Sequence, residues 1–91
     1  MSVTVTIPTI LRPVTGGEKT VHGVGSTLAG LLADLDGRHP GLSGRLLDAE
    51  GALHRFVNVY VNDEDVRFTG QLDTPVGDGD TVTILPAVAG G

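Results

Sequence analysis

The first residues of the chain alternate between apolar and polar side chains. In residues 2–8, threonines separate Val3, Val5 and Ile7. A period of two is typical of a strand that buries one face, and Pro8 ends such a strand because it has no N–H for the next ladder position. We therefore predict a first strand over this segment.

A glycine turn and a second strand follow after an irregular link. Gly16 and Gly17 provide the positive φ that a tight turn needs, and residues 20–22 come shortly after them. We expect this short run to pair back on the first strand as a β-hairpin.

A helical period appears in residues 26–41. Leucines recur there at i, i+3, i+4 and i+7 and form one face of a helix: Leu28, Leu31, Leu32 and Leu35. Ser26 or Thr27 is suited to cap the start, and Pro40-Gly41 stops the helix. Gly30 in its interior costs about 1 kcal/mol relative to alanine, so the helix depends on the packing of its leucine face.

In the middle of the chain, a region without a regular hydrophobic period precedes a segment with the alternation of a strand. Residues 41–55 have no single period, and we expect a loop with a short helical turn at 45–49. The next strand has valines at 57, 59 and 61 on one face and polar or aromatic side chains on the other: Phe56, Asn58, Tyr60 and Asn62. An Asn/Asp-rich turn closes it, and residues 66–68 are a candidate short strand.

The alternation predicts a last strand in residues 81–85, which turns Val82 and Ile84 inward after a Gly/Asp-rich turn. One main helix and four or five strands in this order predict an α+β domain with the helix across one face of the sheet. A chain of 91 residues suffices for one domain with a modest core. We assign residues 1–85 to this domain and 86–91 to an extended C-terminal tail.

Composition and charge exclude several classes of function. The formal net charge is −5 and the six Lys and Arg residues are scattered, so no basic stripe is available for nucleic acid or an anionic membrane. The chain has no cysteine, which excludes disulfides, zinc–thiolate sites and a thiol nucleophile. No signal-peptide pattern or bilayer-length apolar stretch is present, so we expect a cytoplasmic protein.

Candidate chemical motifs in the body of the chain favour structural roles. The acidic groups at 63–65 and 78–80 lack the spacing of a calcium loop and are expected to be turns. The histidines lack metal-binding spacing, residues 15–20 lack the P-loop pattern, and no GxSxG motif occurs. We therefore assign no catalytic residue and no metal ligand, and we do not expect an enzyme.

The C-terminal tail is the remaining candidate for a functional site. Pro86 has no N–H and should end the pairing of the last strand. The residues 86–91, extended at roughly 3.3 Å each, reach about 20 Å, enough to enter a cleft of another protein. Gly90 and Gly91 end the chain, so the reactive group would be the α-carboxylate of Gly91, which no β-carbon obstructs.

Three segments carry a resemblance to a known family. In order along the chain they are TVTIPTILRPVTGG, FVNVYVNDEDVRF and GDTVTILPAVAGG. They resemble the ThiS/MoaD group of sulfur carrier proteins, and within it the actinobacterial carriers of cysteine biosynthesis. The resemblance implies a β-grasp (ubiquitin-like) fold with a mixed sheet and a flexible Gly-Gly tail. It also implies a protein co-substrate rather than an enzyme.

The resemblance further implies a chemistry for the tail. An E1-like partner would use ATP and magnesium to adenylate Gly91 and convert it to a thiocarboxylate, while the carrier itself binds no cofactor. A PLP-dependent cysteine synthase would then use this sulfur on O-phosphoserine, and a zinc peptidase of the JAMM type would release the cysteine. The residues expected to enter partner active sites are Pro86, Ala87, Val88, Ala89 and Gly90.

The docking surface and the sulfur acceptor have more than one interpretation. Related carriers dock through an apolar patch on the exposed sheet face, which makes Tyr60, Phe68 and Leu85 candidates here, with Phe56 beside them. Packing under the 41–55 loop is the competing interpretation for the two phenylalanines. Alternative acceptors are molybdopterin, thiamine or a sulfur-containing secondary metabolite. Alternative functions are a ubiquitin-like modifier, which would join Gly91 to lysines, or a plain interaction module.

Overall fold

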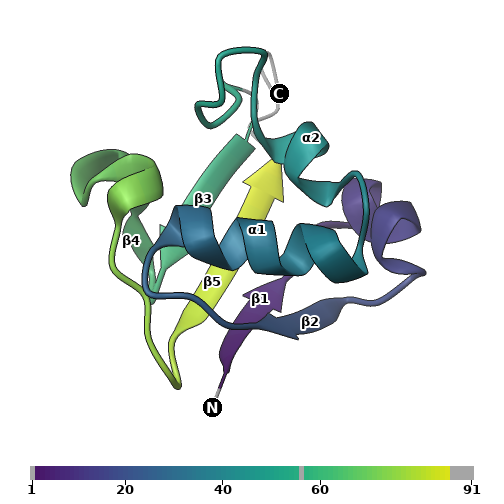
Figure 1. Cartoon of the computed structure of the whole chain (residues 1–91), viewed down its shortest axis with the longest axis horizontal. Helices are drawn as coiled ribbons and strands as arrows, with labels where there is room; N and C mark the ends of the chain where they lie inside the picture. The colour runs from purple at the N-terminus through teal and green to yellow at the C-terminus, as the bar shows by residue number, and fades with distance from the viewer. Residues whose placement is uncertain (1, 56, 87–91) are drawn as a thin grey trace.

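A mixed β-sheet with helices on one face forms the body of the computed structural model, which describes residues 2–55 and 57–86. Within these residues five strands lie in the order β2-β1-β5-β3-β4, with α1 across one face (Figure 1). Strands β1 and β5 are parallel, and the other neighbouring pairs are antiparallel. The bounds are β1 Val3–Thr6, β2 Thr20–Gly23, β3 Val57–Val61, β4 Glu64–Asp65 and β5 Thr81–Pro86. This topology confirms the predicted α+β class and its β-grasp arrangement.

The inward face of the sheet is apolar, as the alternation predicts. In the register of the three central strands, Val5 lies opposite Val82, and Ile84 lies opposite Val59. All four side chains are buried. Val57, predicted to share this face, is only half-buried because it begins its strand at the end of the sheet.

Helix α1, Leu28–Arg38, covers this face with the predicted leucine stripe. Leu28, Leu31, Leu32 and Leu35 are all buried, which confirms that the helix packs through this face. The hydroxyl of Thr27 accepts a hydrogen bond from the N–H of Gly30 at 3.2 Å and caps the first turn. Of the two capping candidates, Thr27 is therefore the one used.

The predicted hairpin is present, with an ordered link. Thr4 lies opposite His22 in the antiparallel β1–β2 pair. The link contains a 3-10 helix, η1, Thr9–Thr15. The following turn has Gly16 at φ 68° and Gly17 at φ 88°, the left-handed conformations for which glycine is suited.

The expected helical turn at 45–49 is misplaced, because a short helix, α2, spans Leu42–Leu46 instead. Leu42 and Leu46 are one turn apart and fully buried, so tertiary packing selects this segment. The carboxylate of Asp36 accepts hydrogen bonds from the N–H groups of Gly41 and Ser43, each at 3.2 Å, and holds the start of the helix. The irregular pattern of residues 41–55 did not show that Leu42 and Leu46 form a buried face.

The candidate strand at 66–68 is also wrong. Strand β4 is Glu64–Asp65, and Val66–Phe68 is a 3-10 helix, η2. Asn62 and Asp63 have φ of 50° and 73°, which makes the turn after β3 so tight that β4 begins at once. The carboxylate of Asp65 then accepts a hydrogen bond from the N–H of Arg67 at 2.9 Å and starts η2. A second 3-10 helix, η3, follows at Gln71–Asp73.

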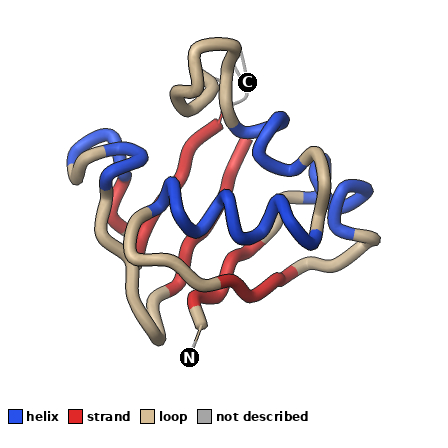
Figure 2. The backbone as a smooth tube through the Cα atoms, in the orientation of Figure 1, coloured by secondary structure: helices blue, strands red, loops and turns tan. Residues whose placement is uncertain are grey.

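The topology brings several chain segments to one end of the sheet. Because β5 runs parallel to β1 and antiparallel to β3, its last residues lie beside the end of β1 and the beginning of β3. The tube in Figure 2 shows α2 and the loop before β3 at this same end. Among residues 2–55 and 57–86, no helix is long and apolar enough to cross a membrane.

Candidate functional site

The last described strand, β5, lies in the middle of the sheet. Strand β5 lies third of five in the sheet order, between β1 and β3. Pro86, which we assigned to the tail, is the last residue of β5 and lies opposite Val57. Residues 87–91, with the predicted sulfur-carrying Gly91 and the tail positions Ala87, Val88, Ala89 and Gly90, lie outside the described residues. Their roles therefore stay predictions.

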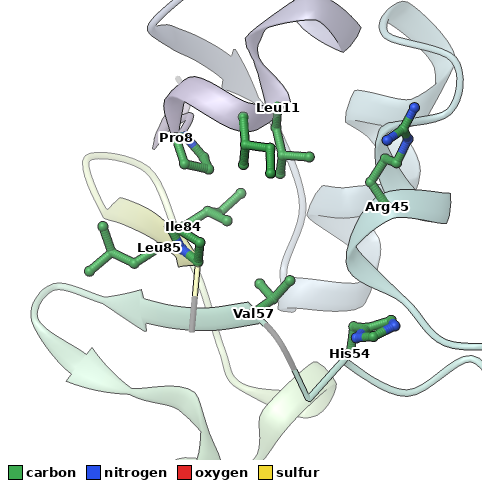
Figure 3. A pocket seen from close by; sticks show the side chains of 9 residues that line it. Pro8, Leu11, Arg45, His54, Val57, Ile84 and Leu85 are labelled. Atoms are coloured by element: carbon green, nitrogen blue, oxygen red, sulfur yellow. The ribbon is translucent and has the colours of Figure 1, made fainter. Parts of the chain in front are cut away.

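A pocket of about 220 Å³, which we call the exit groove, opens beside Pro86. Its walls come from η1 and the residue before it, from α2, from the loop before β3, and from the facing ends of β3 and β5 (Figure 3). The lining residues are Pro8, Ile10, Leu11, Arg45, His54, Val57, Ile84, Leu85 and Pro86. Segments far apart in the sequence thus meet where the chain leaves its last strand.

The exit groove has an apolar floor and an apolar rim. Leu11 and Ile84 belong to the buried core and form the floor. On the rim, Ile10 is 71% exposed and Leu85 is 45% exposed. Exposed large apolar side chains gathered at one place are typical of an interaction surface.

Arg45 and His54 form the polar wall, and both are positioned by α2. The buried Leu42 and Leu46 anchor this helix, which leaves Arg45 exposed on its outer side. The N–H of His54 donates to the carbonyl of Leu46 at 2.8 Å, and the N–H of Val57 donates to the carbonyl of His54 at 3.0 Å. These bonds hold the loop against the end of β3. None of the described residues that line the groove is a carboxylate.

The predicted docking candidates are split between two places. Tyr60 and Leu85 alternate with the inward Val59 and Ile84, so they lie on the sheet face opposite α1. Phe68 lies in η2 beyond the edge strand β4 and is 86% exposed. It is therefore not packed under the 41–55 region.

The remainder of the open sheet face is mainly polar. Its positions on the three central strands include Thr4, Thr6, Thr81, Thr83 and Asn58, by the same alternation. Phe56, the fourth docking candidate, lies outside the described residues. On the described face, an apolar contact is thus restricted to Tyr60 and Leu85.

Sequence analysis did not identify Ile10, Arg45 or His54 as site residues. Ile10 lies in the link that shows no period, and Arg45 lies in the region whose helix was misplaced. The link contains the adjacent apolar residues Ile10 and Leu11, and only the packing of η1 leaves Ile10 exposed while Leu11 is buried. For Arg45, no sequence signal was available, because only the fold brings α2 next to β5.

Of the acidic groups predicted to be turns, Asp63 and residues 78–80 lie in turns, whereas Glu64 and Asp65 form the short strand β4. The carboxylate of Asp78 accepts a hydrogen bond from the N–H of Ser2 at 2.8 Å, and Asp80 accepts one from the N–H of Gly77 at 2.8 Å. The hydrogen bond from the Arg67 side chain, together with its charge, lowers the pKa of Asp65. In the part of the chain that the structure describes, no group of three His, Asp or Glu side chains could hold a metal ion.

Known proteins match this chain over its whole length. The ThiS family matches residues 5–91. Sulfur carrier protein CysO of Mycobacterium tuberculosis is 62% identical over 93 residues, which cover 100% of both chains. A chain in the crystal structure of the Amycolatopsis orientalis BexX/CysO complex matches with a TM-score of 0.91 and 62% identity, covering 98% of this chain and 99% of that one.

An archaeal relative is more distant. Small archaeal modifier protein 3 of Haloferax volcanii is 36% identical over 78 residues, which cover 82% of this chain and 84% of the relative. The ThiS match extends through the last strand and the C-terminal glycines. With this match over residues 5–91 and the 62% identity to a sulfur carrier protein along both chains, the protein belongs to the ThiS family.

Proposed function

We propose that this protein is a sulfur carrier that holds sulfur as a thiocarboxylate on Gly91 and delivers it for cysteine synthesis. The observation that carries this proposal is the 62% identity to sulfur carrier protein CysO along both complete chains. The ThiS family consists of small protein carriers rather than enzymes, and this chain is one of them.

The fold supports delivery by the tail. Strand β5 pairs with β1 through residues 81–83 and with β3 through residues 82–86, so its end is held in place against the beginning of β3. Residues 87–91, fully extended, would reach about 16 Å beyond Pro86 at roughly 3.3 Å each. A partner that recognises the body of the carrier therefore receives Gly91 within this reach of Pro86.

Activation is needed because a carboxylate is a poor electrophile. One carboxylate oxygen of Gly91 attacks the α-phosphorus of ATP, and pyrophosphate leaves. The terminal sulfur of a partner's persulfide then attacks the acyl carbon, and AMP leaves. A thiol attacks the other sulfur of the resulting acyl disulfide, forms a new disulfide and releases the thiocarboxylate. The carrier has no cysteine that could exchange with this sulfur.

The acceptor that we propose is O-phosphoserine on a PLP-dependent cysteine synthase. The thiocarboxylate sulfur displaces phosphate overall, and the resulting thioester rearranges to a cysteine joined to Gly91 by a peptide bond. The CysO of Amycolatopsis orientalis is in a complex with BexX, which supports recognition of this fold by a second protein.

Intact-mass spectrometry tests this function. The carrier is incubated with its E1-like activating enzyme, ATP, magnesium and a sulfur donor, and should gain the mass that replaces one oxygen by sulfur. Deletion of Gly91, or addition of one alanine after it, should leave the thermal unfolding unchanged and abolish the mass gain. Normal sulfur loading of either variant would overturn the proposal.

A modifier function is the second candidate, favoured by the identity of 36% to small archaeal modifier protein 3. In that case Gly91 would form isopeptide bonds with lysines of other proteins. Cell extracts would then contain carrier-linked species of much higher mass, which gel electrophoresis and peptide mapping would detect. A sulfur carrier instead gives the thiocarboxylate on the single chain.

A further inference from the structure

We propose that the exit groove binds the E1-like enzyme that activates Gly91, through an apolar side chain of that enzyme with a carboxylate beside it. This inference rests on the proposed carrier function. It adds to that function a recognition contact on the body of the carrier, formed by Ile10 and Arg45.

The position of the exit groove supplies the first argument. Pro86 is both a lining residue of the groove and the last residue of β5. An enzyme that encloses the following residues must bring the opening of its channel against the surface around Pro86. The exit groove is therefore continuous with the contact that tail insertion already requires.

The exposure of its rim supplies the second argument. Ile10 and Leu85 are two of the large apolar residues that remain exposed in the described structure, at 71% and 45%. Both line the groove together with the buried Leu11 and Ile84. An apolar side chain that fills the groove displaces water mainly from the exposed Ile10 and Leu85, and burial of such area favours association.

The charge around the groove supplies the third argument, because it indicates which polar group of the enzyme lies beside the apolar side chain. The chain carries a net charge of −5, yet the described lining of the groove contains Arg45 and no carboxylate. A guanidinium on the rim pairs in a planar, bidentate way with a carboxylate. An acidic residue of the enzyme is thus attracted to this point and repelled by most of the remaining surface.

The test measures sulfur loading of Gly91 by intact mass at increasing carrier concentration, with the E1-like activating enzyme, ATP, magnesium and a sulfur donor. Ile10→Ser and Arg45→Gln should each raise KM about tenfold and leave kcat within about twofold, because the tail is unchanged. Added salt should raise the KM of the wild type and have a smaller effect on Arg45→Gln.

Matched controls remove the same kinds of side chain elsewhere. Val24, 52% exposed and next to the end of β2, is changed to serine, and the exposed Arg67 is changed to glutamine. Both controls should load with the KM of the wild type. Circular dichroism melts of all four variants establish that they fold.

Each other outcome overturns the inference in a recognisable way. If the wild type loads and Ile10→Ser and Arg45→Gln behave like the controls, the groove is not a partner contact, while the carrier function stands. If the wild type does not load at all, the proposed function fails and this inference fails with it. If Ile10→Ser lowers the sedimenting mass of the isolated carrier, a second copy occupies the groove. If deletion of residues 87–91 shifts the NMR signals of Ile10, the carrier's own tail occupies it.

Discussion

Arg38 and Asp34, one turn apart on α1, together hydrogen-bond to backbone groups along the outer edge of β2. Arg38 Nη2 donates to the carbonyl of His22 at 2.7 Å and to the carboxylate of Asp34 at 2.7 Å. The same Asp34 oxygen accepts a hydrogen bond from the N–H of Val24 at 2.9 Å. Because β2 is an edge strand, these two side chains occupy backbone groups that a strand of another molecule could otherwise use.

Removal of this ion pair should promote self-association. The double variant Asp34→Ala with Arg38→Ala exposes the backbone groups of β2, and we expect a larger dimer fraction than in the wild type. Sedimentation velocity over a range of protein concentrations measures it. Arg67→Ala, which breaks an ion pair with Asp65 without exposing a backbone group of a strand edge, is the control. Equal dimer fractions in both variants would contradict the protective role.

Stability should fall when the protein is acidified. Hydrogen bonds from Val24 and the Arg38 charge lower the pKa of Asp34, and hydrogen bonds from Ser43 and Gly41 lower the pKa of Asp36. An aspartate with a depressed folded-state pKa stabilises fully above its unfolded value of about 3.9, and this contribution is lost as pH falls through the folded-state value. Urea unfolding at several pH values measures the loss. Asp36→Asn should show a shallower acid dependence than the wild type, and an unchanged slope would argue against this role of Asp36.

Helix α2 should contribute substantially to stability although it is short. Leu46 is fully buried, so Leu46→Ala should lower the free energy of unfolding by about 2–5 kcal/mol. Leu47→Ala, at the adjacent and only partly buried position, should cost clearly less. Chemical denaturation of both variants measures the difference. A similar small cost for both would mean that residues 41–55 act as a loop.

Two glycines should respond in opposite ways to alanine. A β-carbon on Gly25 would lie 2.5 Å from the backbone nitrogen of Leu31, so Gly25→Ala should destabilise by about 1–3 kcal/mol as the start of α1 shifts. A β-carbon on Gly37 meets nothing within 4 Å, and Gly37→Ala should stabilise α1 by up to about 1 kcal/mol. Thermal unfolding of both variants decides this. A stable Gly25→Ala variant would show that the close approach at Gly25 is not tight.

Local patterns were sufficient for the elements that bury a regular face. The leucine period of α1 and the alternation of β1, β3 and β5 follow from the rule that one side of each element is apolar. They therefore predicted the α+β class and the inward Val82 and Ile84. The bounds of α2 and β4 could not be predicted in this way, because the first depends on burial of Leu42 and Leu46 and the second on one tight turn.

The amino-acid sequence by itself determined that this chain packs one main helix on a sheet and that two glycines follow its last strand. Both features follow from patterns of residues that are close together along the chain. Only the tertiary structure decided that Ile10, Arg45 and Leu85 share a groove beside Pro86, since these residues come together through the parallel pairing of β1 with β5 and the packing of α2. Contacts between distant segments arise from the way strands pair in space, and no pattern within one segment records them.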